Sequence, residues 1–468
     1  MSLNGSTKSL RKKATTDLTI GDPLKVILLF AVPVYLSNIF QQFYNLTDVA
    51  IIGHKLGDDA LSAIGSVSII YGLFNSLAFG MGNGFSIVIS KYFGAGKPKE
   101  LKKAVFNTLA IAIVWSILLT IAGCLSLRPL MKLLNTPDSI FDSAYSYAQI
   151  LLALIVLPFA YNVLSGMLRA IGNSRAPLYF LMISVMTNIV LDLLFVYGLD
   201  KGLPGAAIAT ALSQALSSTI CLIYILLKVP ELHFSREDMV LSRTMISDLF
   251  SAGISFAMMF TVVNVGTVVL QRAINGFGED TIAAHTTARK ISELCMMMVG
   301  TMATAMATFA GQNYGAGKFD RIREGLKKTL FCSFAIASVL IIFIYTLGGL
   351  MVRLISGSSN SDIIDTATFY LKVDLPFYYV LAVVLITRST LQGVGSKLAP
   401  IVASLMELLL KVFTAGWLAK KLGYTGIAVC EPIVWTVCAI YILIVFFNNK
   451  DIKKSSPHSG VQTSEPET

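Results

Sequence analysis

Two aspartates stand inside long apolar stretches of the sequence, where a charge is costly unless it faces a partner or a cavity. Asp48 is preceded by Asn45 and Gln41, three and seven residues earlier, which predicts a polar stripe on one helix face. Asp192 follows Asn188 by four residues, so these two side chains also share a helix face. The alternative roles are an interfacial aspartate that faces water and a hydrogen-bonded pair that joins two helices.

The chemistry that such side chains can perform is ion coupling. Carboxylate and amide oxygens are hard ligands that suit a small cation such as Na⁺. A carboxylate removed from water also binds a proton more readily. Asp48, Asn188 and Asp192 are therefore predicted to bind the ion whose gradient drives movement, and both Na⁺ and H⁺ remain open.

A second set of charged residues lies in the C-terminal half of the chain. Glu293 follows Arg289 by four residues, which predicts either an internal ion pair or a second site for a coupling ion or a cationic substrate. Glu407 and Lys411 have the same spacing with the glutamate first, the order that favours a structural helical pair. Glu431 lies in the last apolar stretch, and its role stays open.

Pro33 lies roughly four turns before Asp48 in the same apolar stretch. Proline removes a backbone hydrogen bond and kinks a helix, so we expect an interruption of the first helix here. The kink is either static or a hinge that links bending of the helix to the state of Asp48.

Long apolar helices must position these residues. The chain has 468 residues, of which 55% are hydrophobic and only 14% are charged, with a mean hydropathy of +0.71. A soluble protein keeps about a quarter of its residues charged, so lipid must cover most of this surface. Helices are expected because the apolar stretches lack the alternation of barrel strands. Twelve segments meet or approach the roughly 20 residues that a membrane span needs: 25–51, 60–83, 104–124, 143–166, 177–198, 204–228, 248–274, 281–310, 329–352, 367–388, 398–420 and 424–447.

Basic residues predict the orientation of these helices. With the N-terminus inside, most of the 37 Lys and Arg residues fall in inside segments, Arg388 among them, which predicts two cytoplasmic termini. The net charge of +10 is then a topology signal, since no basic stripe with interleaved aromatics indicates nucleic-acid binding. The polar segment from Asn448 to Thr468 is expected to be disordered.

The chain also repeats itself at a nearly constant offset. Each copy holds six predicted helices, so both copies have the same orientation in the membrane. This predicts an all-α polytopic protein with two six-helix lobes related by an axis along the membrane normal, and a central cavity between them. The paired segments are Phe93–Lys97 with Tyr314–Lys318, Leu168–Pro177 with Leu391–Pro400, and Gly57–Leu61 with Gly278–Ile282.

The expected organisation follows from this repeat. It comprises an N-terminal tail (1–24), an N-lobe (25–229), a cytoplasmic linker (230–247), a C-lobe (248–447) and a C-terminal tail (448–468). Gly94-Ala-Gly-Lys97 is interpreted as a basic cytoplasmic turn, because it lacks the glycine spacing and preceding strand of a phosphate loop. Gly80, Gly82 and Gly84 are interpreted as sites of close helix packing.

Together these residues resemble the multidrug and toxin extrusion (MATE) family of bacterial transporters. The stretch Asn45–Gly53 is similar to the family's first-helix signature, and Gly205–Thr210 to its sixth helix. The resemblance implies efflux of amphipathic or cationic compounds by antiport with H⁺ or Na⁺ through alternating access. It implies a cation site at Asp48, Asn188, Asp192 and Thr210, with Pro33 as the bending point. Further expected neighbours of the site or the substrate are Gln41, Asn45, Tyr147, Asn162 and Glu293.

The sequence departs from one branch of the family, in which helix seven carries a glutamate and helix ten an aspartate. Here helix seven has no acidic residue from Gly253 to Ile274. Helix ten has only Asp374, which we expect near its outer end. The pattern is closer to the branch that relies on the first lobe.

Other classes of function predict different residues. A flippase of lipid-linked saccharides, the main alternative, needs several cations in the cavity, and only Arg289 and Lys411 are candidates. A passive channel needs no paired carboxylates inside one lobe, and a scaffold tolerates their loss. No nucleophile–base pair indicates an enzyme, and no cofactor is expected. We expect a monomer in the bacterial inner membrane that binds small amphipathic or cationic substrates and lipid, and no nucleic acid.

Overall fold

The computed structural model describes residues 15–454, and the regular structure in this range is helical. Eleven helical segments are long and apolar enough to cross a membrane. The elements are α2 (Pro23–Gly94), α3 (Pro98–Leu133), α4 (Asp138–Ala153), α5 (Val156–Ala170), α6 (Arg175–Asp192), η1 (Leu193–Gly198), α7 (Gly202–Lys228), η2 (Pro230–Leu232), η3 (Arg236–Asp238), α8 (Arg243–Ile274), α9 (Glu279–Gly315), α10 (Phe319–Ser356), α11 (Ser361–Asp374), η4 (Leu375–Phe377), α12 (Tyr378–Gly393), α13 (Leu398–Leu422), α14 (Tyr424–Ala428), α15 (Cys430–Asn448) and α16 (Lys450–Lys453).

The element α2 contains two spans. Its 72 residues would extend about 108 Å as one straight helix, far beyond a hydrocarbon core of about 30 Å. Gly57 divides it, with φ 78° and ψ −169° between helical neighbours. Its counterpart Gly278 has φ 92° and precedes α9. Glycine stands at both turns because a side chain disfavours this conformation. Counting α2 twice, the described chain has the twelve spans that the sequence predicted.

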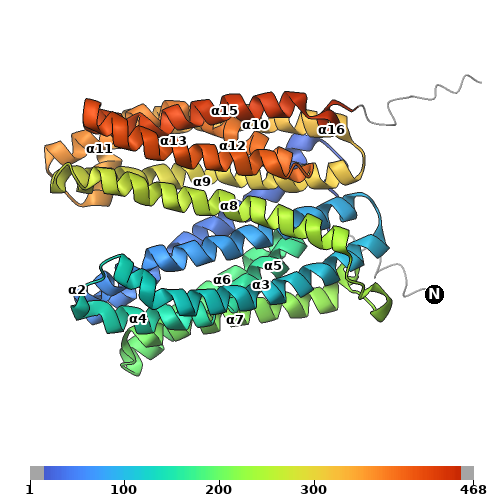
Figure 1. Cartoon of the computed structure of the whole chain (residues 1–468), viewed down its shortest axis with the longest axis horizontal. Helices are drawn as coiled ribbons and strands as arrows, with labels where there is room; N and C mark the ends of the chain where they lie inside the picture. The colour runs from blue at the N-terminus through green and yellow to red at the C-terminus, as the bar shows by residue number, and fades with distance from the viewer. Residues whose placement is uncertain (1–14, 455–468) are drawn as a thin grey trace, which may run out of the picture.

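The spans form two lobes (Figure 1). The elements α3 to α7 gather in one lobe and α9 to α15 in the other, with α2 and α8 between them. The repeat extends to irregular features, since each lobe has one broken span. The break between α4 and α5 falls at Leu154 and Ile155, and its counterpart in the C-lobe is the turn η4 between α11 and α12.

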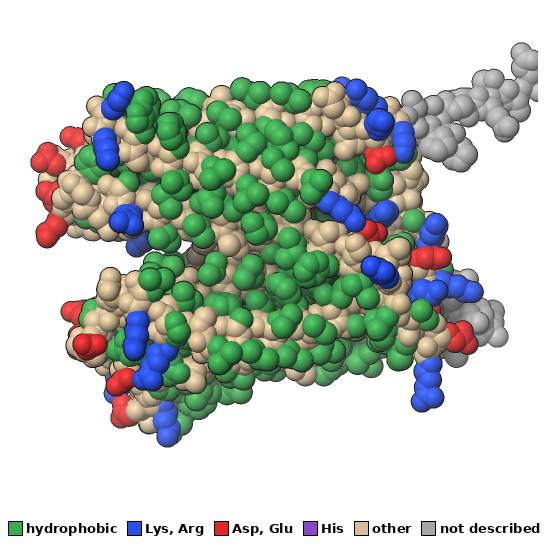
Figure 2. Space-filling model, viewed as in Figure 1, with side chains coloured by type: hydrophobic (Ala, Val, Ile, Leu, Met, Phe, Trp, Pro, Cys, Tyr) green, Lys and Arg blue, Asp and Glu red, His purple; other side chains and the backbone are tan. Residues whose placement is uncertain are grey.

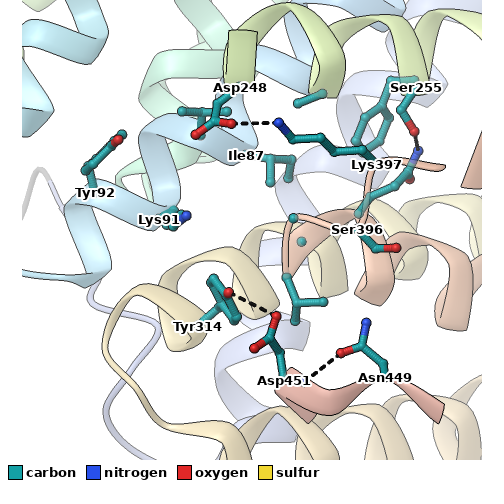
Figure 3. Close-up of a pocket in the computed structure, with 17 residues that line it drawn as sticks. Ile87, Lys91, Tyr92, Asp248, Ser255, Tyr314, Ser396, Lys397, Asn449 and Asp451 are labelled. Atoms are coloured by element: carbon teal, nitrogen blue, oxygen red, sulfur yellow. Dashed lines mark hydrogen bonds and ion pairs between the residues drawn. The ribbon is translucent and has the colours of Figure 1, made fainter. Parts of the chain in front are cut away.

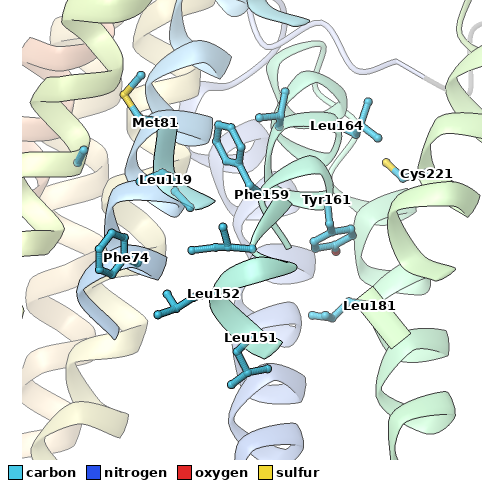
Figure 4. Close-up of a cluster of buried hydrophobic side chains, with 14 of the residues drawn as sticks. Phe74, Met81, Leu119, Leu151, Leu152, Phe159, Tyr161, Leu164, Leu181 and Cys221 are labelled. Atoms are coloured by element: carbon cyan, nitrogen blue, oxygen red, sulfur yellow. The ribbon is translucent and has the colours of Figure 1, made fainter. Parts of the chain in front are cut away.

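The first span of α2 belongs to both lobes. Ile27 and Phe30, near its start, pack in a cluster built mainly from α9, α10 and α12. Tyr44 and Ile52, further along, pack in the large N-lobe cluster, part of which is drawn in Figure 4. The helix therefore crosses from the C-lobe core at one end of the molecule to the N-lobe core at the other.

The helix α8 makes the reciprocal crossing. Met245 and Leu249, near its start, lie in the N-lobe cluster. Leu270 and Ile274, near its end, pack with α13, α14 and α15. The first helix of each repeat thus enters the core of the opposite lobe at the end of the molecule that carries both described termini (Figure 1).

The lobes separate at the other end. The second span of α2 and the helix α9 are mostly buried over 78–90 and 301–313, whereas nearer the other end α2, α8 and α9 carry exposed polar side chains, which include Ser68, Asn264, Thr267 and Glu293. Figure 2 shows the molecule hollowed between the lobes at this end. Polar side chains at this depth avoid lipid, so these three helices line a cleft. The cleft floor is marked by Asn264, which donates a hydrogen bond from its side chain to Ser76 Oγ at 2.5 Å.

Four sequence expectations prove wrong in the described range. α2 continues through Pro33 without interruption, and Ser37 donates its hydroxyl hydrogen to the Pro33 carbonyl at 2.9 Å. Arg388 is not in a loop but is 1% exposed inside α12. Asp374 is not near an outer end but is fully buried at the helix break in the span Ser361–Gly393. Residues 450–453 of the C-terminal segment form α16, which packs on α10. The rest of the predicted tails, 1–14 and 455–468, lies outside the described residues.

Candidate functional site

The two intramembrane aspartates of the N-lobe come from different helices. Asp48 lies on the first span of α2 and is 8% exposed, while Asp192 is the last residue of α6 and is fully buried. Asn188, one turn before Asp192, is also fully buried. The helix then changes to the π-helical turn η1. This geometry is rare in proteins, and many of the known examples lie at functional sites.

The structure brings the two carboxylates together. Asp48 and Asp192 lie close enough to act directly on each other, and Asn188 acts on Asp192. Tyr147 of α4 is under the electrostatic influence of both aspartates, as is Tyr44, and Thr210 of α7 lies beside Tyr44. We call this group the N-lobe carboxylate site: Asp48, Asn188 and Asp192, with Tyr44, Tyr147 and Thr210 around them.

Several buried polar atoms of this site form no hydrogen bond of normal geometry. They are Oδ1 of Asp48, both carboxylate oxygens of Asp192, both polar atoms of the Asn188 side chain and the Tyr44 hydroxyl. More than nine in ten buried polar groups in proteins are hydrogen bonded, so such a group of orphaned oxygens requires an explanation. These hard oxygens fit Na⁺, and a proton would equally neutralise the pair.

The site also lacks a counter-charge. Within residues 15–454, no Lys or Arg forms an ion pair with Asp48 or Asp192. Two adjacent carboxylates in a low-dielectric interior repel each other by several kcal/mol when both are ionised. The arrangement therefore favours uptake of a positive charge.

In the C-lobe, by contrast, Arg and Lys side chains neutralise buried glutamates. Glu431 of α15 receives a hydrogen bond from Arg289 at 2.5 Å and lies 3.2 Å from the Lys411 ammonium. Lys411 also lies 3.3 Å from Glu407, which lies 3.3 Å from Arg388. We call these five residues the C-lobe charge chain. Its alternating signs compensate each carboxylate internally, as a buried ionic network requires.

Two further carboxylates adjoin this chain. Asp374 accepts a hydrogen bond from Ser292 at 2.7 Å, while its Oδ1 is buried without a partner. Glu293 lies 4.0 Å from Arg289 at the edge of an ion pair, and its side chain is 52% exposed. The close partner of Arg289 is Glu431, so Glu293 keeps an exposed carboxylate with only this outer contact to a cation among the described residues. Lys290, which is also exposed, lies one turn away on the same helix.

Not all predicted neighbours join the N-lobe carboxylate site. Asn45 is exposed and Gln41 is half-buried, so the polar stripe expected around Asp48 is only partly buried. The residue one turn before Asp48 that interacts with it is Tyr44. The backbone of Asn162 in α5 packs against Gly82 of α2. The predicted helical pair of Glu407 and Lys411 is confirmed by its ion pair.

At the end of the molecule that carries the described termini, which we call the closed end, helices of the two lobes approach closely at the repeated glycines. A methyl group at Gly94, the last residue of α2, would overlap the Gln312 carbonyl. A methyl group at Gly315, the last residue of α9, would overlap the Lys91 carbonyl. These are equivalent positions of the two repeats, so the two motifs cross each other on the pseudo-two-fold axis. The predicted role of Gly80 and Gly84 in close packing is confirmed, since their Cα atoms face the backbone of α8.

A cavity of about 210 Å³ lies beside this crossing, between the end of α2, the start of α8 and the loop after α12 (Figure 3). Its charges are satisfied locally: Lys397 lies 2.8 Å from Asp248, and Tyr314 donates a hydrogen bond to Asp451 at 3.4 Å. The crossing and this cavity therefore lie side by side at the end of the molecule that carries the described termini.

Comparison with known proteins gives the family. A family model described as MatE matches residues 33–194 and 254–417, which are the two repeats. The chain belongs to the MatE family. Two relatives come from Bacillus subtilis (strain 168). One, "Probable multidrug resistance protein YpnP", is 28% identical over 437 residues, covering 91% of this chain and 96% of the relative. The other, "Probable multidrug resistance protein YoeA", is 26% identical over 387 residues, covering 81% and 83%.

Solved MATE structures have the same fold. A MATE transporter in its bent conformation matches with a TM-score of 0.86 and 23% sequence identity, covering 95% of this chain and 97% of that one. The protein is thus a polytopic membrane protein of a bacterial multidrug efflux family, and a transporter rather than an enzyme.

Proposed function

We propose that this MATE protein exports amphipathic, often cationic compounds in exchange for H⁺ or Na⁺ that enters through the N-lobe carboxylate site. The observation that carries the proposal is the contrast between the lobes. The N-lobe buries two adjacent carboxylates with orphaned oxygens and no counter-charge, whereas Arg and Lys compensate Glu407 and Glu431 within the C-lobe.

The coupling step follows from that contrast. When an ion or proton arrives from the open end, it removes the repulsion between Asp48 on α2 and Asp192 on α6 and lets the two helices approach. Asn188 and Thr210 supply further oxygens if the ion is Na⁺. An ion drives the cycle only if it binds one conformation more tightly than the other. We propose Pro33 as the bending point, because it lies where α2 leaves the C-lobe cluster.

The substrate step uses the cleft. Glu293 is the exposed carboxylate on the wall formed by α9, and the neighbouring walls carry neutral polar side chains such as Ser68, Asn264 and Thr267. A cationic group can approach Glu293 because Glu431 already holds Arg289. A large anionic headgroup, as a flippase requires, would find Lys290 as the exposed cation on this face of α9, and the other C-lobe cations are engaged in the charge chain.

The remaining expectations complete the proposal. The end that carries the termini faces the cytoplasm of a bacterial inner membrane, and the cleft opens to the outside. The N-lobe spans residues 25–229 and the C-lobe 248–447, joined by the linker 230–247. The protein works as a monomer, because each chain holds both lobes and a complete cleft.

Uptake of a fluorescent cationic dye into inverted vesicles tests this proposal, with Na⁺ and proton gradients imposed separately. Asp48→Asn and Asp192→Asn are expected to abolish gradient-driven accumulation while the variants stay folded. Asp58→Asn is the matched control, because Asp58 is exposed just beyond the turn at Gly57. Transport that survives both site substitutions would refute the N-lobe assignment. Failure of both gradients with a broad set of dyes would refute the drug assignment.

A further inference from the structure

The segment before the first helix is unusually well anchored for a chain terminus. Residues 15–22, which we call the N-terminal strap, are non-helical but run along the closed end of the molecule. Leu18 is fully buried and belongs to the core cluster that α9, α10 and α12 form. Terminal residues are usually poorly ordered unless specific contacts hold them.

Those contacts come from the C-lobe and are mostly to the strap backbone. Asn313 donates a hydrogen bond to the Leu18 carbonyl at 3.2 Å, and Lys318 donates one to the Thr19 carbonyl at 2.8 Å. Arg321 donates one to the Gly21 carbonyl at 2.6 Å. Asp22 accepts one from Lys328 at 2.5 Å, and this contact lowers the pKa of Asp22.

Gln312 joins the strap to both lobes at once. Its side-chain oxygen accepts the Leu18 amide hydrogen at 2.9 Å, and its side-chain nitrogen donates to the Ala170 carbonyl of the N-lobe at 2.7 Å. Gln312 is fully buried in α9, where its own carbonyl faces Gly94 at the crossing. The strap also meets the N-lobe directly, because a methyl group at Gly172 would overlap the Thr16 carbonyl.

The pseudo-symmetry gives this strap a counterpart that differs in one respect. The linker before α8 is held by Asn107 of α3, which donates to the Val240 carbonyl at 2.9 Å and accepts the Ser242 amide hydrogen at 3.1 Å. That linker is tied covalently to α7 of the same lobe. Within residues 15–454 the strap joins directly only to α2, so hydrogen bonds and packing, which can break, hold it on the C-lobe.

We propose that the N-terminal strap is a releasable latch that holds the termini end of the transporter closed, and that Gln312 is the residue that fastens it. Opening this end separates the helix crossing at Gly94 and pulls Gln312 away from Ala170. The Leu18 contact shares the same side chain, so the strap and the crossing loosen together. The latch goes beyond the proposed transport function, and its test needs no transported substrate.

Hydrogen–deuterium exchange of the full chain in nanodiscs, followed by mass spectrometry, tests the latch. Gln312→Ala removes both bonds. Losing the Leu18 bond is expected to speed exchange in the strap, and losing the Ala170 bond to speed it at the ends of α2 and α9, each by up to about tenfold, the effect of one net hydrogen bond. Gln312→Glu keeps the acceptor for Leu18 but removes the donor to Ala170. It should preserve strap protection more than Gln312→Ala does.

Gln271→Ala is the matched control, because Gln271 bonds only its helical neighbour Asn275 at the open end. It should leave exchange at the closed end unchanged. A variant that lacks residues 1–21 keeps all twelve spans and separates release from misfolding. Its crossing peptides should exchange faster while peptides of the N-lobe core keep wild-type protection. If Gln312→Ala and the truncation both leave the crossing peptides at wild-type rates, the strap is not a latch.

Discussion

The two lobes should respond oppositely to the same chemical change, the replacement of a buried carboxylate by its amide. Glu431→Gln leaves Arg289 and Lys411 without the carboxylate that lies 2.5 Å and 3.2 Å from them. Removing one partner of a buried ion pair costs about 3–5 kcal/mol, because the other charge stays buried and uncompensated. We therefore expect Glu431→Gln to lower the free energy of unfolding by this amount.

Asp192→Asn should have the opposite sign. Two unit charges 4 Å apart repel by about 4 kcal/mol at an effective dielectric constant of 20, so removing one relieves up to that amount when both aspartates are ionised. The variant retains the shape of the side chain, and Asp48 loses no cation partner, because it has none in the wild type within residues 15–454. We expect a thermal midpoint at or above that of the wild type, although the variant does not transport.

The assay is thermal unfolding in detergent at one scan rate, followed by the fluorescence of the three tryptophans, of which Trp435 is 2% exposed near the C-lobe charge chain. The scan rate must match because large proteins often unfold irreversibly. A double variant, Glu431→Gln with Arg289→Gln, should recover part of the loss because it rebalances the chain. If Asp192→Asn destabilises as much as Glu431→Gln does, the contrast between compensated and uncompensated carboxylates is wrong.

Three further predictions concern other parts of the molecule. Glu293→Gln should raise KM for cationic dyes about tenfold, the effect of one charge-assisted contact. The thermal midpoint should change little, because the side chain is half-exposed. An unchanged KM in vesicle transport would show that Glu293 is not part of the substrate site. Gly94→Ala should lower the thermal midpoint, because the added methyl group would overlap the Gln312 carbonyl. Gly65 has open space around it, so Gly65→Ala should raise stability by about 1 kcal/mol through helix propensity. Equal effects of the two substitutions would contradict the close helix crossing at Gly94. The pKa of Asp22 is lowered from 3.8 by Lys328. The ionised carboxylate therefore stabilises the fold fully at pH values above 3.8, and this contribution is lost only as the pH falls further. The difference in strap protection between wild type and Asp22→Asn should be the same at about pH 5 and about pH 7, and a smaller difference at the lower pH would count against this linkage.

Much of the architecture could be predicted from local properties of the chain. A membrane span needs a certain length of apolar residues, so hydropathy alone located the twelve helices. The repeat was equally visible, since Gly57 and Gly278 occupy the same place in the two copies and both adopt positive φ. Asp48 and Asp192 stood out as candidates because a charge is rare in an apolar helix, and the structure places them together.

Other features of the structure could not be predicted from the sequence, because they depend on contacts between residues far apart in the chain. The sequence alone assigns no role to Glu431, because its partner Arg289 lies 142 residues away. Spacing along one helix suggested Glu293 for Arg289 instead, and the structure places that pair at the edge of contact. The sequence predicts Asp374 near the outer end of its membrane span, whereas the structure buries it fully at the break between α11 and α12.

The sequence by itself determined that this protein crosses the membrane twelve times, repeats a six-helix unit and buries carboxylates, because hydrophobic length and the cost of a charge in lipid act on each segment separately. Tertiary structure alone decided which carboxylates are compensated, where the lobes touch and what holds the N-terminal strap. Those outcomes depend on which side chains meet across lobes, and only the packed fold brings Gln312 within reach of both Leu18 and Ala170.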